Sequence, residues 1–345
     1  GRPPARGHAR LRHPWLSGAG LARLPVRAID TGPQRLATGA HRHGHSPVRP
    51  NSVHATLREW ADDVYIIRYR EDTRQLAGVL QREGFTVHLQ EGPYTAEQLT
   101  YSPSIQCLVN HANAWARVAA GTRAAIIVEP DFVPVRGFGG RPCPMPRVLS
   151  DPRVGIAWLY GCGTILNGMD EFGYLHGHAA SVAGYIVTPA VAAMLLDFFA
   201  SEMQQDDPGH YRPWDVTLGG YLRQEKGLLN YLPLYQLGEH GSDSRAEHAE
   251  HGMRKNWHQA DILAGPLSFL PIYARGSRWR LARYRLRGWV WGWLRLLTRR
   301  YFHPGNVRDD SARGPVFISA LSVLRLLRLV RVLGVRSTGE AASPG

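Results

Sequence analysis

The sequence predicts an α/β fold built around a mixed, mainly parallel sheet. Two apolar runs rich in β-branched residues, 64–67 and 85–89, flank a stretch at 72–83 whose apolar residues recur at helical spacing. A strand, a helix and a second strand within about 30 residues are typical of a parallel βαβ unit. The most apolar strand candidate, 124–128, follows a predicted helix at 105–120 and continues the same alternation.

The alternation continues towards the C-terminus. Expected strands and helices follow one another in the order strands 154–159 and 181–188, helices 189–199 and 214–223, and strand 231–235. Between the first two strands, His176 and His178 flank a glycine. We expect them to lie in a surface loop, with a ligand role as the alternative.

Charge divides the 345-residue chain into three expected parts. Its net charge of +13 is concentrated at the ends, with nine Arg against one Asp in residues 1–50 and fifteen Arg against two Asp in 275–336. The middle is acidic. An enzyme that acts on nucleic acid more often carries its positive charge on the surface of the folded domain that binds the nucleic acid, so we expect no nucleic-acid partner. The expected parts are a disordered basic segment (1–57), a folded domain (58–274) and a basic aromatic tail (275–345).

The tail is typical of a helix that lies on a membrane surface. Residues 275–300 hold nine Arg and no acid, interleaved with Trp and Tyr, and residues 316–336 repeat the theme with Leu and Arg. Aromatic rings suit the headgroup level, and the cations suit anionic lipid. The alternatives are a tail that packs on a partner or is disordered, and a tail that binds single-stranded nucleic acid.

Cysteine content and hydropathy suggest where the protein works. Three cysteines without a CxxC pair fit a reducing compartment, no apolar run reaches the 18 or so residues of a membrane span, and no signal-peptide pattern opens the chain. We therefore expect a cytoplasmic protein that is peripheral on the inner face of the cell membrane.

Two acids follow the most apolar strand. Glu129 and Asp131 are separated by one residue, and ligands of open α/β sheets bind beyond the carboxyl ends of strands. Their oxygens suit a divalent cation, Mn²⁺ or Mg²⁺, which a diphosphate needs in order to bind beside two carboxylates. The simpler interpretation is a polar loop start. His240 is a candidate third ligand of the metal.

Five segments in order resemble glycosyltransferase family 25, the lipopolysaccharide-biosynthesis type. The segment 104–115 resembles the family's G-x-x-G-C-x-x-S-H-x-x-x-W, and 126–131 resembles its apolar strand ending in Glu-Asp-Asp. Residues 183–190 are similar to its A-Y-I-V-S-x-x-G/A segment, 213–215 to its P-x-D motif, and 64–70 to its opening strand, I-N-L-x-x-R. The resemblance covers about residues 62–250.

This resemblance implies a GT-A-like nucleotide-sugar-binding domain followed by basic amphipathic helices. It also implies a UDP-sugar donor (galactose in several members), inversion at the anomeric carbon, and a lipopolysaccharide or related, lipid-linked glycan as acceptor. The chain departs from the pattern where Pro130 replaces the middle acid, Asn110 replaces a Ser, and Arg68 stands where Asn or Leu is usual. The loss of one acid leaves metal dependence open.

An inverting enzyme needs a general base, and Asp215 is our first candidate. Its alternative role is to cap the helix that follows, and the two roles can coexist. Glu239 is the second candidate for the base. His111 is a candidate for orienting a donor phosphate, with packing inside its helix as the alternative, and Cys107 beside it is expected in the core.

Two other functions remain compatible with the sequence. One is a catalytically inactive binding protein that keeps the sugar-nucleotide fold, an interpretation motivated by Pro130. The other is a membrane-surface scaffold in which only the basic tail matters.

Overall fold

The computed structural model describes most of the chain between residues 55 and 297. The described ranges are 55–91, 94–146, 153–170, 174–205, 207–233, 235–242 and 259–297. All of them belong to one compact unit. The basic N-terminal segment and the amphipathic stretch expected at 316–336 lie outside the described residues.

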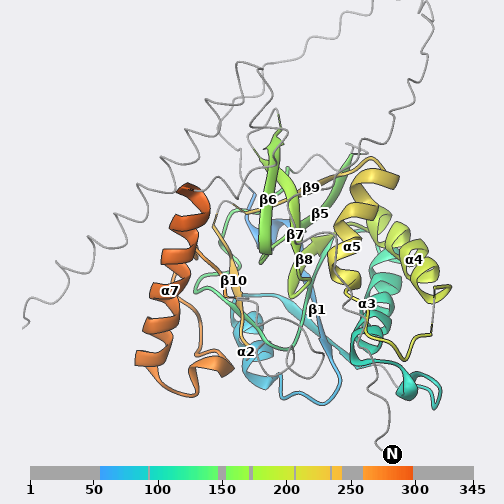
Figure 1. The fold of residues 1–345 in the computed structure, drawn as a ribbon, viewed down its shortest axis with the longest axis horizontal. Coiled ribbons are helices and arrows are strands. Elements are labelled where there is room, and N and C mark those ends of the chain that lie inside the picture. The colour runs from blue at the N-terminus through green and yellow to red at the C-terminus, as the bar shows by residue number, and fades with distance from the viewer. Residues whose placement is uncertain are drawn as a thin grey trace, which may run out of the picture. The chain divides into compact units, whose positions relative to one another are not determined.

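A mixed sheet in the order β2-β1-β3-β8-β5-β9-β7-β6 forms the centre of the domain (Figure 1). Its strands are β1 (Asp63–Arg68), β2 (Thr86–Glu91), β3 (Ala125–Val128), β5 (Val154–Trp158), β6 (Cys162–Met169), β7 (Leu175–Ala180), β8 (Gly184–Val187) and β9 (Leu229–Tyr231). A second, two-stranded sheet pairs β4 (Phe132–Pro134) with β10 (Gly238–His240).

The expected α/β class with a mixed sheet is confirmed. β1 pairs in parallel with both β2 and β3, as the βαβ pattern predicts, and β5 pairs in parallel with β9. β8 runs antiparallel to both of its neighbours, β3 and β5, and β7 runs antiparallel to β6 and β9. Sequence periodicity gives no direction to a strand, so the antiparallel pairs could not be predicted from it.

Helices cover both faces of the sheet. They are α1 (Leu57–Trp60), α2 (Arg74–Arg82), α3 (Pro103–Ala119), α4 (Pro189–Met203), α5 (Trp214–Gly220) and α7 (Arg278–Leu297), with the short turns η1 (Gln98–Thr100), η2 (Tyr221–Glu225) and η3 (Ile272–Ala274). Ser102 and Thr188 cap α3 and α4 through their hydroxyls, and a proline opens each helix.

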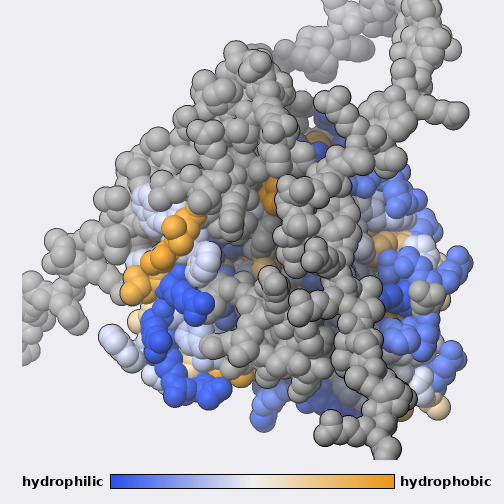
Figure 2. Space-filling model, viewed as in Figure 1, coloured by the Kyte–Doolittle hydropathy of each residue, from blue (hydrophilic) through white to orange (hydrophobic). Residues whose placement is uncertain are grey.

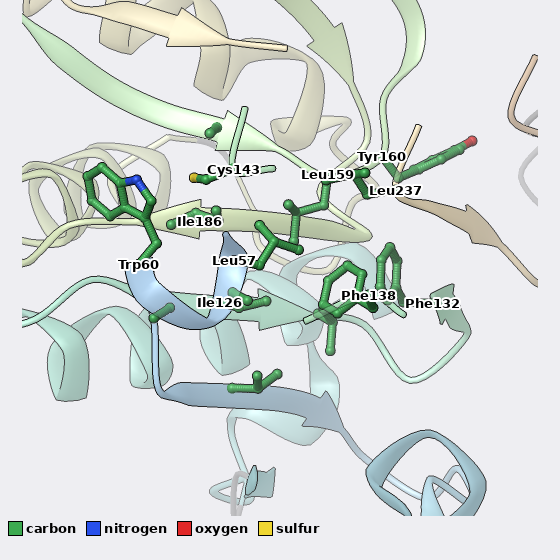
Figure 3. Close-up of a cluster of buried hydrophobic side chains, with 14 of the residues drawn as sticks. Leu57, Trp60, Ile126, Phe132, Phe138, Cys143, Leu159, Tyr160, Ile186 and Leu237 are labelled. Carbon is green, nitrogen blue, oxygen red and sulfur yellow. The ribbon is translucent and has the colours of Figure 1, made fainter. Parts of the chain in front are cut away.

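Alternation along β3 divides the core into two layers. Ile127 packs in the layer that α3, α4 and α5 cover, and these three helices lie on one side of the sheet in Figure 1. Ile126 packs in the other layer, in one cluster with Leu57 and Trp60 of α1 and Ile186 of β8 (Figure 3). Both faces of β3 are therefore buried, and polar side chains are confined to its ends.

The expected loop around His176 and His178 is wrong. Both residues lie on β7, which forms a hairpin with β6, and their imidazoles are half-buried on the same face of the strand. A Cβ on Gly177, between them, would collide with the backbone carbonyl oxygen of Ile165. Close approach of the two strands thus requires a glycine, the residue that made the segment resemble a loop.

Helix α7 contacts the rest of the domain through Arg285, whose side chain is mostly buried. Arg285 Nη1 lies 2.6 Å from Glu239 Oε2 of β10 and 2.7 Å from the Ala260 carbonyl oxygen. The Ala260 N–H donates to the other Glu239 oxygen at 2.6 Å. Gly288, one turn further along α7, lies so close to Ala260 that a Cβ would come 2.9 Å from its carbonyl oxygen. Contacts thus cross the expected domain boundary at 274/275.

The opposite face of α7 is exposed and mixes apolar with basic residues. Leu286, Val290 and Leu294 recur every four residues, and Trp279 precedes them by two turns. The arginines at 280, 283 and 287 are also exposed. Figure 2 shows hydrophobic and hydrophilic residues side by side on the exposed surface of α7. Among the described residues, none of the helices combines the length and the hydropathy needed to cross a bilayer.

The contact between Arg285 and Glu239 yields a stability prediction. Changing Arg285 to Met removes the guanidinium and leaves a fully buried carboxylate without its cation, so we expect a loss of about 3 kcal/mol in the free energy of unfolding. Urea denaturation measures this loss. The matched control is Arg287→Met on the exposed face of the same helix, expected within about 0.5 kcal/mol of wild type. Equal stability of the two variants would show that the buried pair contributes nothing.

Candidate functional site

The turn Glu129-Pro130-Asp131 joins β3 to β4 at the carboxyl end of the buried strand. The Phe132 N–H donates to the Glu129 carbonyl oxygen at 3.1 Å and closes the turn. The Glu129 N–H in turn donates to the Ala183 carbonyl oxygen at 3.0 Å, which ties the turn to the start of β8. Pro130 occupies the second position of this turn, where its fixed φ is favourable. The proline therefore keeps both flanking carboxylates at the sheet edge.

Strand β10 brings His240 to this turn. β10 runs antiparallel to β4 with His240 opposite Phe132, and the Gly241 N–H donates to the Asp131 carbonyl oxygen at 2.9 Å. The His240 Nε2 atom lies 3.3 Å from Asp131 Oδ2. Potential ligand atoms of Glu129, Asp131 and His240 all lie within 4.8 Å of one another. The structure thus groups the three residues that the sequence nominated as metal ligands.

This acidic triad (Glu129, Asp131 and His240) has the chemistry of a cation site. Two carboxylates and an imidazole suit Mn²⁺ among the divalent metals. Within the described part of the chain, the buried Oδ1 atom of Asp131 has no hydrogen-bond partner, whereas Oδ2 accepts from the Ser242 N–H at 3.1 Å. The Ser242 hydroxyl lies 3.0 Å from His240 Nδ1, so it can accept that proton and leave the Nε2 lone pair for a metal. The residues therefore fit a divalent cation.

His111 and Cys107 approach Glu129 from α3. His111 Nε2 lies 3.5 Å from Glu129 Oε1, and Cys107 Sγ lies 3.6 Å from the same oxygen. Burial alone would raise the pKa of Glu129, but His111 and the nearby His240 lower it below its usual range. The His111 side chain is completely buried, so its contact is with Glu129, and direct contact with a donor phosphate does not fit the structure. Cys107 is only partly buried, and its thiol lies at the site as well as against the core.

Asp215 lies in the first turn of α5, whose start is anchored by the preceding residue. The Trp214 indole N–H donates to the Ser104 carbonyl oxygen at 2.9 Å, and its ring packs edge-on against His111 at 5.2 Å between centroids. The N-cap of α5 is Pro213, so Asp215 is within the helix rather than at its cap position. The residue is partly buried, and its carboxyl group interacts electrostatically with Glu129.

The environment of Asp215 raises its pKa to about 6. Burial is the main cause, and the negative charge of Glu129 adds to it. Backbone N–H groups of Ser181 and Val216 oppose the rise. Ser181 has the left-handed φ of 84°, which is unusual for a residue other than glycine and concentrates at functional sites. A carboxyl group that changes charge near pH 6 is suited to taking up a proton under physiological conditions.

Glu239 is not part of this cluster. Its side chain is completely buried and both oxygens are engaged, one by Ala260 and one by Arg285. Side chains of successive strand residues point to opposite faces, so Glu239 turns towards α7 where His240 turns towards Asp131. Sequence reasoning could not find this because Arg285 lies 46 residues further along the chain. It also missed Ser242 and Tyr185, whose hydroxyls hold the two histidines.

Comparisons with known proteins give a weak likeness to glycosyltransferases. Neither a family model nor a curated protein sequence matches the chain. A solved glycosyltransferase involved in glycosylation of the major capsid of PBCV-1 is 12% identical, with 55% of this chain and 98% of that chain covered and a TM-score of 0.38. A Drosophila β1,4-galactosyltransferase 7 mutant, in complex with manganese, UDP-Gal and xylobiose, is 10% identical, with 57% and 75% covered and a TM-score of 0.31.

The acidic triad predicts that the isolated protein binds Mn²⁺. Changing Asp131 to Asn keeps its volume but removes its charge and one ligand oxygen, so we expect Mn²⁺ affinity to fall at least about tenfold. Electron paramagnetic resonance of free Mn²⁺ measures the binding. Asp197→Asn, at an acid whose side chain is 71% exposed, is the matched control and should bind as wild type does. Unchanged affinity in the Asp131 variant would exclude this residue as a ligand.

Proposed function

We propose that this protein is a glycosyltransferase that moves a sugar from a nucleotide-sugar donor to a glycan. The observation that carries the proposal is the meeting of the acidic triad with Asp215, a carboxyl group whose pKa is raised to about 6, at the end of β3. The ordered sequence motifs that resemble family 25 are the second support. They make a UDP-sugar the expected donor, with galactose the first sugar to test.

Each residue of the site has a role in this proposal. A bound Mn²⁺ or Mg²⁺ would neutralise the leaving diphosphate, and Glu129, Asp131 and His240 are the residues that would hold it. Asp215 comes from a different element, accepts the proton of the incoming sugar hydroxyl, and so acts as the general base of an inverting transfer. Trp214 fixes the start of α5 against α3, which keeps the base in position.

The proposed acceptor is a lipopolysaccharide or related lipid-linked glycan. The exposed face of α7 supports this choice, because its leucine, valine and tryptophan residues lie beside three exposed arginines. An anionic membrane surface is the partner that suits such a face, because its headgroups would pair with the arginines and its acyl region would take up the apolar side chains. We propose that the protein works at the cytoplasmic face of the cell membrane, where α7 holds it near a lipid-linked substrate.

The alternative of an inactive binding protein rested on Pro130. Because the proline fits the second position of its turn and leaves Glu129 and Asp131 within reach of one cation, it is no reason to expect lost activity. Transfer of sugar from a donor distinguishes the two functions directly.

We expect wild-type protein to transfer or hydrolyse a UDP-sugar in the presence of Mn²⁺, and Asp215→Asn to lower the rate at least about 10²-fold. Asn keeps the size of Asp and removes its basicity. A panel of UDP-sugars, with UDP-galactose first and a glycan acceptor present, measures the rates. The wild-type rate should fall as the pH drops below about 6, because the base must be deprotonated to accept a proton.

Stability provides the control for this variant. A folded-state pKa raised above the usual value of an Asp means that its ionisation costs stability as the pH rises towards 6. At pH 7.5 the Asn variant should therefore melt at the wild-type temperature or above. A variant that melts early yet transfers normally per folded molecule would identify Asp215 as a structural residue.

Membrane binding is tested by cosedimentation with vesicles that contain anionic phosphatidylglycerol. Changing Leu286 and Val290 together to Ser removes exposed apolar area and keeps the buried Arg285 pair, so we expect a clear loss of vesicle binding without a loss of folding. Leu99→Ser, at a leucine that is 53% exposed elsewhere on the domain, is the matched control. Equal cosedimentation of both variants with wild type would remove α7 as the membrane contact.

A further inference from the structure

A buried chain of hydrogen bonds leads from the core of the domain to Glu129. The Trp115 indole N–H of α3 donates to the Tyr185 hydroxyl oxygen of β8 at 2.6 Å. That oxygen lies 2.9 Å from His111 Nδ1, and His111 Nε2 faces Glu129. The first three side chains are completely buried. Trp214 packs against the imidazole from α5, so the ring is held by neighbours on two sides.

The chemistry of each group gives the chain a direction. An indole N–H can only donate, so the Tyr185 oxygen is an acceptor towards Trp115. Burial raises the pKa of Tyr185 well above its usual value, which keeps the hydroxyl proton on the phenol. His111 Nδ1 is the acceptor within reach of that proton. A neutral imidazole that accepts at Nδ1 carries its own proton on Nε2, the atom that faces Glu129.

At the outer end of this series of hydrogen bonds, His111 Nε2 faces the Glu129 carboxylate. Among the described residues, His111 Nε2 has no hydrogen-bond partner, and its 3.5 Å separation from Glu129 Oε1 is slightly long for one. A small rotation of the carboxylate brings the two atoms into hydrogen-bond contact. With one oxygen of Glu129 turned to His111, the other is left for a cation.

The direction of the hydrogen bond from Tyr185 to His111 also decides between two overlapping groups of potential metal ligands. Cys107, His111 and Glu129 also have ligand atoms within 4.8 Å of one another, and a thiol with an imidazole would suit a soft metal such as Zn²⁺. An Nε2 atom that carries a proton has no lone pair for a metal. The hydrogen bond from Tyr185 thus leaves His111 Nε2 protonated and unable to bind a metal. Glu129 then remains available to bind a cation together with Asp131 and His240.

We propose that Trp115, Tyr185 and His111 are positioning residues that orient Glu129 for the cation of the acidic triad, and that His111 is not itself a metal ligand. This inference rests on the proposed cation site and adds to it the residues that hold one of its ligands in place. Partners behind a metal ligand commonly change metal affinity 10- to 100-fold when they are removed, which sets the size of the expected effect.

Tyr185→Phe tests the proposal by removing one oxygen. Its matched control is Tyr231→Phe. Tyr231 is also almost fully buried, and its hydroxyl donates to Asp170 Oδ2 at 3.1 Å, which is not part of the series of hydrogen bonds that leads to Glu129. We expect both variants to lose some thermal stability, and Tyr185→Phe alone to bind Mn²⁺ at least about tenfold more weakly, as measured by electron paramagnetic resonance of free Mn²⁺. Equal Mn²⁺ affinity in Tyr185→Phe and wild type would overturn the proposal.

A second measurement starts from wild-type protein, so its main result does not depend on the folding of a variant. Co²⁺ bound by the acidic triad should lack the intense near-ultraviolet absorption of a cobalt–thiolate bond. Such a band, lost in Cys107→Ser, would place the metal on Cys107, in the alternative group of ligands, and would overturn the assignment. Failure of wild-type protein to bind either metal would instead reject the cation site on which the proposed function rests, so the two failures are distinguishable.

Discussion

Burial of β3 on both faces is the constraint on which the rest of the site depends. Ile126 and Ile127 pack into opposite layers of the core, and no polar side chain can follow until the strand leaves the sheet. Glu129 is the first residue to do so, and its own N–H is bound to the Ala183 carbonyl oxygen at the start of β8. The position of the carboxylate is therefore set by the pairing of two central strands, which is among the most rigid features that a fold can offer.

Residues that surround this turn come from four separate parts of the chain. Asp131 belongs to the turn, His111 to α3, Asp215 to α5 and His240 to β10. Contacts between these elements fix their positions, as with the Trp214 indole that anchors α5 on the Ser104 carbonyl oxygen of α3. Burial is the main cause of the raised pKa of Asp215, and the negative charge of Glu129, which these contacts bring near it, adds to the rise.

Local patterns in the sequence were sufficient for the elements that carry the site. The β-branched run 126–128 and the helical spacing around His111 and Trp115 predict β3 and α3 because burial imposes those periods directly. The β6–β7 hairpin was missed because its glycines, needed for close strand contact, resemble those of a loop. Burial of His111 and the pairing of Glu239 with Arg285 depend on distant segments, which no local pattern contains.

The buried pair between Glu239 and Arg285 also bears on how the protein can be divided. Glu239 and His240 are neighbours on β10, one turned towards α7 and the other towards Asp131. A fragment that stops at residue 274 would leave the Glu239 carboxylate in an apolar interior without its guanidinium, on the strand that carries His240. A fragment that keeps this pair therefore extends beyond Arg285, whereas the charge pattern alone would cut the chain at residue 274, eleven residues earlier.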